Sequence, residues 1–312
     1  MVTFGILGTG AIAKKFCEAV TMVADAEVVA VASRRLDRAD EFANSWNIPR
    51  RYGSYEELLL SEKLDVVYIA TTNDTHKDLC MQALRHKHNV LCEKPMVMHL
   101  DDAKSIFALA KENQCFIMEA MWSRFIPCLV KVRKWIGEGR IGKVHMANMM
   151  VAVDASANHR IRNKDLGGGI LYDLGVYPLE ILPFLLDKQV LDVRSIVKMT
   201  DDGIDRAEGI LLDFGFCIAS VHCSMDVGMS APSVICGESG YISIYVGHKA
   251  KLVELFDKEG SLVESFSNSY TNGLEYQVEH VCACLEKGLL ESPVVSYADT
   301  LACTALFEKI LP

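Results

Sequence analysis

The feature that most constrains this chain is a glycine turn directly after its first apolar run. The run from Phe4 to Leu7 ends at Gly8, and the next residues place Ile12, Phe16 and Val20 four apart, on one face of a helix. Where a dinucleotide binds between a first strand and its helix, glycines are needed because a side chain would keep the backbone away from the pyrophosphate. The order strand, glycine turn and helix therefore predicts the start of a doubly wound α/β domain.

The turn itself reads Gly8-Thr9-Gly10-Ala11-Ile12-Ala13. Gly8 and Gly10 leave room for the pyrophosphate, and Ala13 stands where a third glycine would pack helix against strand. A glycine turn that serves only packing is the alternative, but the position between strand and helix favours the dinucleotide interpretation. We expect cofactor contacts from Gly8, Thr9, Gly10, Ala11 and Ile12.

The remainder of the first 121 residues alternates buried strands with helices. Ser54 and Glu57 have the spacing of a capping box before one of these helices. Further strands are predicted at 28–32, 66–70, 90–92 and 115–118, and helices around 79–84 and 103–110. Regular alternation implies a parallel sheet covered by helices, so residues 1–121 form the predicted dinucleotide-binding domain.

The pattern changes near Trp122, where strand-like stretches joined by tight turns begin. They are expected at 144–153, 193–199, 209–214, 217–225, 241–245 and 252–256, with helices at 127–135, 167–186, 275–287 and 297–310. This predicts a second α+β domain over 122–312, with an open, mainly antiparallel sheet and helices on one face. We expect it to bind substrate and to mediate homo-oligomerisation.

Composition narrows the class of ligand. The 312 residues carry a formal net charge of −9, whereas nucleic-acid phosphates require a basic surface. No apolar stretch approaches the roughly 18 residues that span a bilayer, and the N-terminus lacks a signal-peptide pattern, so we expect a cytoplasmic protein without a membrane partner. The eleven cysteines lie mostly singly in apolar runs, which indicates reduced core thiols and no metal site.

The end of the second predicted strand bears on the choice of cofactor. An enzyme that uses NAD usually presents a carboxylate there to the adenosine ribose. This chain has Ser33, Arg34 and Arg35 instead, followed by Arg38. A hydroxyl and guanidinium groups suit a 2′-phosphate, so NADP is favoured and NAD stays possible. A solvated basic turn is the alternative interpretation.

Two further loops follow buried strands at the same edge of the predicted sheet. In the first, Thr71, Asn73 and His76 are candidates for contacts with ribose or nicotinamide, although a helix cap would also explain this loop. In the second, Glu93 and Lys94 precede a proline. An ion pair between them is one alternative, but neighbours on a strand point to opposite faces, which favours Lys94 facing the cofactor.

Asp173 and Tyr177 lie four apart in a helical stretch and are therefore expected on one face. A free tyrosine has a pKa of about 10, and a nearby ammonium favours the phenolate. With Lys94 as that ammonium, Tyr177 becomes a candidate general acid and base. A tyrosine packed in the core is the alternative.

These segments together resemble the glucose-fructose oxidoreductase, inositol dehydrogenase and MocA family over essentially the whole chain. The resemblance is strongest to the branch of dimeric trans-dihydrodiol dehydrogenases and NADP-dependent D-xylose dehydrogenases, through Glu119–Phe125 and Gly167–Tyr177. It implies an N-terminal Rossmann domain and a C-terminal α+β domain whose open sheet often forms a dimer. The loop with Thr72 departs from the family, which commonly has proline before this asparagine.

The resemblance also implies roles for individual residues. Lys94 and Tyr177 match the catalytic pair, and Asp173 lies beside them. Positions that line the substrate pocket or its entry are matched by Trp122, Arg124 and Arg160. Packing at the domain junction is the alternative for Trp122, and a loop ion pair is the alternative for Arg160.

The resulting hypothesis is an NAD(P)-dependent dehydrogenase acting on a small sugar or on a vicinal or cyclic diol. A catalytically silent nucleotide sensor of the same fold is the alternative from another class. A sensor needs only the cradle, so the presence of both Lys94 and Tyr177 favours the enzyme. A third hypothesis is an enzyme of the same fold that uses transient redox chemistry to hydrolyse its substrate. No residue of this chain is dedicated to such a reaction.

Overall fold

The computed structural model describes residues 1–229 and 231–312, which form two compact units. The N-terminal unit comprises Met1–Trp122 and Thr271–Leu301, and the C-terminal unit comprises Ser123–Tyr270 and Ala302–Pro312. The sequence-based division placed the segment 271–301 in the second domain. In the structure, its helix α8 (Glu275–Glu286) packs against helix α1 of the N-terminal unit.

The N-terminal unit contains a six-stranded parallel sheet with the order β3-β2-β1-β4-β5-β6. Its strands are β1 (Val2–Leu7), β2 (Ala26–Ala32), β3 (Arg50–Tyr52), β4 (Val66–Ile69), β5 (Asn89–Cys92) and β6 (Ile117–Glu119). Its helices are α1 (Ala11–Val20), α2 (Leu36–Trp46), α3 (Tyr55–Ser61), α4 (Asn73–Arg85), α5 (Leu100–Asn113) and α8. This strand order is that of a dinucleotide-binding Rossmann fold, so the predicted fold class is confirmed.

Apolar burial explains why these segments form a parallel sheet. All four residues of β4 are buried, as expected for a strand covered by helices on both faces. Between α1 and the sheet, Phe16 stacks on Tyr68 with ring centroids 3.7 Å apart. The predicted cap of α3 is present, since the Glu57 amide donates to Ser54 Oγ over 3.2 Å. Strand β3, with three residues at the sheet edge, was not predicted.

The C-terminal unit is built on a nine-stranded sheet with the order β15-β14-β13-β12-β7-β10-β9-β8, and β11 also pairs with β7. Its strands are β7 (Val144–Asp154), β8 (Asp192–Met199), β9 (Asp205–Asp213), β10 (Ile218–Ser224), β11 (Asp226–Met229), β12 (Ser233–Gly237), β13 (Gly240–Tyr245), β14 (Leu252–Asp257) and β15 (Leu262–Ser267). The sheet is mainly antiparallel, as predicted, although β10 runs parallel to β7.

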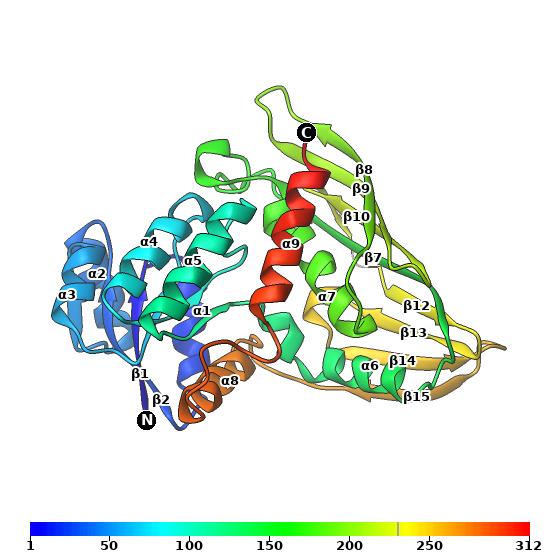
Figure 1. Ribbon diagram of the computed structural model, residues 1–312, viewed down its shortest axis with the longest axis horizontal. Coiled ribbons are helices and arrows are strands. Elements are labelled where there is room, and N and C mark those ends of the chain that lie inside the picture. Colours follow the sequence, from blue (N-terminus) through cyan, green and yellow to red (C-terminus); the bar gives the residue numbers. More distant parts are fainter. Residues whose placement is uncertain (230) are drawn as a thin grey trace. The chain divides into compact units, whose positions relative to one another are not determined.

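Helices cover one face of this sheet. On that face α6 (Pro127–Gly137) contacts β14 and β15, and α7 (Val176–Leu186), η3 (Leu171–Gly175) and η4 (Gly247–Lys249) contact β7. The unit also includes the second half of α9 (Tyr297–Ile310) and the short helical turn η2 (Lys164–Leu166), and the turn η1 (Trp122–Phe125) begins at the last residue of the N-terminal unit. Figure 1 shows α6 and α7 on the same side of the sheet. The run 164–186 is long and apolar enough to cross a membrane, but 83% of its apolar window is buried in the structure, as in a core helix.

The helix predicted over 167–186 is interrupted. Before α7 the chain makes the π-helical turn η3, in which the Val176 amide donates to the Leu171 carbonyl five residues earlier. Such wide turns occur mostly as single insertions in helices and often at functional sites. The turn contains Asp173, so the four-residue spacing to Tyr177 does not span a regular α-helix.

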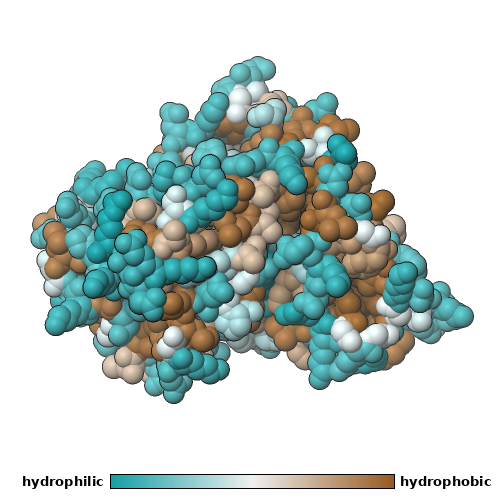
Figure 2. Space-filling model, viewed as in Figure 1, coloured by the Kyte–Doolittle hydropathy of each residue, from teal (hydrophilic) through white to brown (hydrophobic). Residues whose placement is uncertain are grey.

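The opposite face of the sheet exposes large apolar side chains. Met146 on β7 pairs with Ile218 on β10, and the two side chains are 54% and 57% exposed. Ile196 on β8 and Leu211 on β9 are also exposed. Figure 2 shows hydrophobic residues at the surface among hydrophilic ones on the face in view.

Candidate active site

The glycine turn between β1 and α1 has the geometry of a dinucleotide cradle. Gly8 has φ +106°, and a Cβ there would lie 2.6 Å from the Ala70 carbonyl oxygen, so only glycine allows β1 and β4 to end side by side. Gly10 precedes the first turn of α1, and a Cβ at Gly10 would meet only the Ala70 oxygen, at 4.0 Å. The space before the helix is thus open to a pyrophosphate. Ala13 is fully buried against the sheet, as predicted.

The end of β2 presents the predicted basic group. Ser33 is buried and its amide donates to the Tyr52 carbonyl, whereas Arg34 and Arg38 are exposed. Arg35 differs from them because its guanidinium pairs with the carboxylate of Asp37. Arg34 also interacts with the Tyr55 hydroxyl. A contact of Arg34 or Arg38 with a 2′-phosphate stays a prediction.

The loop after β4 is tied to the loop that follows Lys94 through His76. His76 is fully buried on α4, and its Nδ1 lies 2.9 Å from the Pro95 carbonyl oxygen while its Nε2 lies 3.4 Å from the Thr71 carbonyl oxygen. The ring thus ties the loop after β4 to the loop that follows Lys94. Asn73 is the first residue of α4, at the carboxyl end of the sheet. Its contact with a cofactor, and that of His76, stay predictions.

Buried side chains hold the Lys94 turn from both sides. Tyr68 Oη donates to the Glu93 carboxylate over 2.5 Å, so this acid has a partner other than the neighbouring lysine. The Met96 amide donates to Glu119 Oε1 over 2.9 Å. Glu119 also accepts from Thr300 Oγ1 over 2.8 Å. No local sequence pattern marks Glu119 as a support, because its partners lie far away along the chain.

In the C-terminal unit, Tyr177 has an aromatic partner. Its ring stacks on the imidazole of His248 with centroids 4.3 Å apart and planes 24° apart. The backbone of η4 is held in turn, since Ser123 Oγ donates to the His248 carbonyl over 2.9 Å. His248 lies 71 residues after Tyr177, and nothing in the local sequence marks it.

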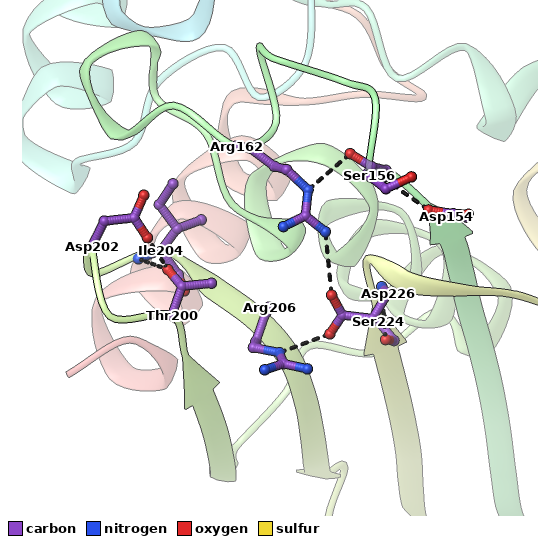
Figure 3. Close-up of polar contacts among 10 residues, drawn as sticks. Asp154, Ser156, Arg162, Thr200, Asp202, Ile204, Arg206, Ser224 and Asp226 are labelled. Atoms are coloured by element: carbon purple, nitrogen blue, oxygen red, sulfur yellow. Dashed lines mark hydrogen bonds and ion pairs between the residues drawn. The ribbon is translucent and has the colours of Figure 1, made fainter.

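Arg160 and Asp173 form an ion pair within the same unit. The loop that carries Arg160 is fastened by a second arginine, because Arg162 Nε donates to the Ala155 carbonyl over 3.0 Å and its Nη2 lies 3.3 Å from Asp226 Oδ1. Figure 3 shows Arg162 reaching Asp226 from the loop. The loop ion pair considered for Arg160 is therefore present, and it places a guanidinium beside the predicted carboxylate.

The remaining predicted positions have structural partners. Arg124 is buried and pairs with Glu180 over 2.5 Å, and its Nη2 also donates to the Glu180 carbonyl over 2.9 Å. Trp122 begins η1 and is buried where the chain passes from one unit to the next. A substrate contact by Arg124 or Trp122 stays a prediction.

The cysteines behave as core thiols within the described residues, where all eleven are free. Burial raises the pKa of the Cys17 thiol to about 12 and that of Cys282 to about 11, with Asp25 adding to the effect at Cys282. Nucleophilic chemistry requires the thiolate, so these shifts disfavour a cysteine mechanism. Over residues 1–229 and 231–312, no group of three metal-binding side chains is assembled.

The N-terminal unit carries a glycine cradle and Lys94 at the carboxyl end of a Rossmann sheet, and the C-terminal α+β unit carries Tyr177. This combination is that of a nicotinamide-dependent oxidoreductase. Residues 2–121 match the family model described as "Oxidoreductase family, NAD-binding Rossmann fold", and residues 129–243 match the Gfo/Idh/MocA C-terminal domain. The chain belongs to the Gfo/Idh/MocA family. The predictions of the family, of an NAD(P)-dependent oxidoreductase and of a nicotinamide cofactor are confirmed.

Named relatives cover nearly the whole chain. The trans-1,2-dihydrobenzene-1,2-diol dehydrogenase of Xenopus tropicalis is 31% identical over 99% of this chain and 96% of its own length. The mouse enzyme of the same name is 33% identical over 98% and 95%. The human one is 30% identical over 98% and 95%.

Solved structures share the fold at lower identity. An aldose-aldose oxidoreductase from Caulobacter crescentus, complexed with glycerol, superposes with a TM-score of 0.88 at 21% identity and covers 99% of this chain and 96% of its own. A 3-ketoreductase from Actinomadura kijaniata, in complex with NADP and TDP-benzene, gives 0.86 at 23% identity, with 99% and 96% covered.

Proposed function

We propose that the protein oxidises a secondary alcohol of a vicinal or cyclic diol, or of a small sugar, and reduces the corresponding carbonyl in reverse. The observation that carries the proposal is the Lys94 turn, which buried side chains hold at the carboxyl edge of a sheet that also bears the open glycine cradle. The relatives named after a cyclic vicinal diol support this substrate class.

Proton transfer is assigned to Tyr177. A bound nicotinamide supplies the hydride acceptor or donor. In the oxidation, the substrate C–H bond breaks and its hydrogen leaves with the electron pair as hydride. The O–H bond of the hydroxyl breaks as its proton passes to the Tyr177 phenolate, and the C=O bond forms. Lys94 favours the charged form of the tyrosine by its ammonium charge. Asp173, held by Arg160, orients the substrate hydroxyl, and Trp122 and Arg124 complete the proposed substrate contacts.

NADP is the proposed cofactor in preference to NAD. The exposed guanidinium groups of Arg34 and Arg38, with the Ser33 hydroxyl, suit a 2′-phosphate, since guanidinium binds phosphate oxygens through paired hydrogen bonds. We assign four further residues to the nicotinamide end of the cofactor site: Thr71, Asn73, His76 and Glu93. His76 and Glu93 act there through the backbone that they position.

The proposed assembly is a cytoplasmic homodimer through the open face of the C-terminal sheet. Exposed apolar residues such as Met146 and Ile218 lie side by side there, as expected of an interaction surface. Light scattering of the purified chain tests this: we expect twice the monomer mass for the wild type and the monomer mass for the double variant Met146→Asp/Ile218→Asp.

The activity is tested by following reduction of NADP across vicinal diols, aldoses and inositols. Turnover of one of these classes supports the proposal. Tight binding of NADP without turnover of any alcohol or carbonyl would instead favour the nucleotide sensor.

A further inference from the structure

Strand β9 carries two buried carboxylic acids that the mechanism above does not use. Asp205 and Glu208 are 3% and 4% exposed, although a three-residue spacing would normally place them on opposite faces of a strand. A β-bulge at Arg206 removes the conflict, because Lys198 pairs with Ala207 while Met199 pairs with Asp205. Both acids therefore face the helical layer.

The extra residue of the bulge points the other way. The Arg206 side chain is 49% exposed, and its Nε donates to Asp226 Oδ2 over 2.7 Å. Figure 3 shows Arg206 directed to Asp226, which also accepts a hydrogen bond from Arg162 of the neighbouring loop. The bulge thus directs Arg206 to Asp226 and leaves Asp205 facing the helical layer.

The two acids contact opposite ends of the π-helical turn η3. At its start, the Leu171 amide donates to Asp205 Oδ2 over 2.7 Å, and a Cβ on Gly169 would lie 2.0 Å from Asp205 Oδ1. At its end the contact is one of packing and not a hydrogen bond, since a Cβ on Gly175 would lie 3.4 Å from Glu208 Oε2. The turn between these contacts contains Asp173, and Tyr177 follows two residues after it ends.

The surroundings favour one shared negative charge on this pair. Burial and the two acids raise the pKa values of Cys223 on β10 and of Tyr172 on η3, with Glu308 adding to the effect at Tyr172, so these neighbours of the pair stay neutral. Burial, with the neighbouring Asp205 carboxylate, raises the pKa of Glu208 to about 9. Two interacting carboxyl groups ionise in separate steps, so Glu208 stays protonated while Asp205 accepts the Leu171 amide.

We propose that Asp205 and Glu208 are positioning residues for the reaction. They clamp the π-helical turn Leu171–Gly175 between the Asp205 hydrogen bond at its start and the Glu208 packing contact at its end, and so fix Asp173 and Tyr177. Neither acid touches substrate in this account. The inference rests on the proposed function only for its effect on turnover, because the clamp itself is a property of the C-terminal unit.

Kinetic variants test the clamp. Asp205→Ala removes the acceptor of the Leu171 amide and should lower kcat at least about tenfold. The Kd for NADP should stay within about twofold, since the cofactor cradle belongs to the other unit. Glu208→Ala should behave similarly, whereas Glu208→Gln keeps a neutral group of the same shape and should restore kcat at pH 7. The matched control is Asp213→Ala, the same change at the far end of β9, where the side chain accepts from the Gly215 amide.

The pH profile separates positioning from a merely structural role. In the wild type, ionisation of Glu208 near pH 9 places two charges beside the turn, so kcat should fall there. With Glu208→Gln this fall should move to higher pH by about half a unit or more. Wild-type kcat in both Asp205→Ala and Glu208→Ala, or an unchanged alkaline limb in Glu208→Gln, would overturn the proposal.

A spectroscopic experiment decides the matter even if no substrate turns over. Tyr172→4-fluorophenylalanine places a non-titrating 19F reporter on η3, beside both acids. Its resonance should titrate with a midpoint near pH 9 in the otherwise wild-type chain and with Asp213→Ala, and stay constant with Glu208→Gln. The same titration with Glu208→Gln would refute the clamp, whereas a positive result without turnover would refute only the proposed activity.

Discussion

The phenol ring of Tyr177 stacks on the imidazole ring of His248, with centroids 4.3 Å apart. Because η4 is anchored by Ser123, this stack fixes the direction of the tyrosine from a segment remote in sequence. His248→Ala should lower kcat about tenfold through a less ordered phenol, while His248→Phe, which keeps an aromatic face, should lose less than about threefold. Steady-state kinetics on both variants check this. Equal losses in the two would show that stacking is not what matters.

Exposed guanidinium groups after β2 give a prediction on cofactor choice. Arg34→Asp should raise the Kd for NADP at least about tenfold more than the Kd for NAD, because a carboxylate repels the 2′-phosphate. Arg35→Ala is the control, since the Arg35 guanidinium is already paired with Asp37. Isothermal titration with both dinucleotides measures the effect, and a uniform weakening of NADP and NAD would contradict the assignment.

Glu119 holds the backbone that follows Lys94. Glu119→Ala leaves the Met96 amide without its buried acceptor, which costs about 1–3 kcal/mol, and should lower both the melting temperature and kcat. Glu119→Gln retains an acceptor oxygen and should stay close to the wild type. Thermal unfolding and kinetics of the two variants test the prediction. Wild-type activity in Glu119→Ala would show that the Lys94 turn does not need this support.

The buried Glu208 predicts how stability depends on pH. Its pKa is raised in the folded chain from 4.5 to about 9, so between these values the folded state holds a proton that the unfolded chain has lost. This contribution to stability is complete below pH 4.5 and declines as the pH rises to about 9. Glu208→Gln lacks the decline, so its melting temperature should gain on the wild type by about 3 °C or more between pH 5 and pH 9. Parallel curves over this range would contradict a protonated Glu208.

Local sequence patterns predicted the parts of the site that lie within single segments. The apolar run, glycines and helix spacing around Gly8 indicated the cradle, and burial of Ala13 agrees with the packing expected there. Alternation of buried strands and helices indicated the sheet. These features depend on neighbours within a few residues, so one sequence is enough to detect them.

Contacts between distant segments could not be predicted in this way. His248, Glu119 and Glu208 act through partners that the fold brings to them, and their own neighbourhoods carry no distinguishing pattern. The π-helical turn also escaped detection, because the stretch around Asp173 has the apolar spacing of an ordinary helix. Edge strands such as β3 and β15 are short or half exposed and lack the continuous apolar run of β4.

The most direct test of the central claim compares the wild type with Tyr177→Phe in the formation of NADPH from a cyclic vicinal diol. The account predicts that kcat falls by about 100-fold or more while the Kd for NADP changes less than about twofold, because the variant lacks only the proton-accepting hydroxyl. An undiminished kcat in Tyr177→Phe would contradict it.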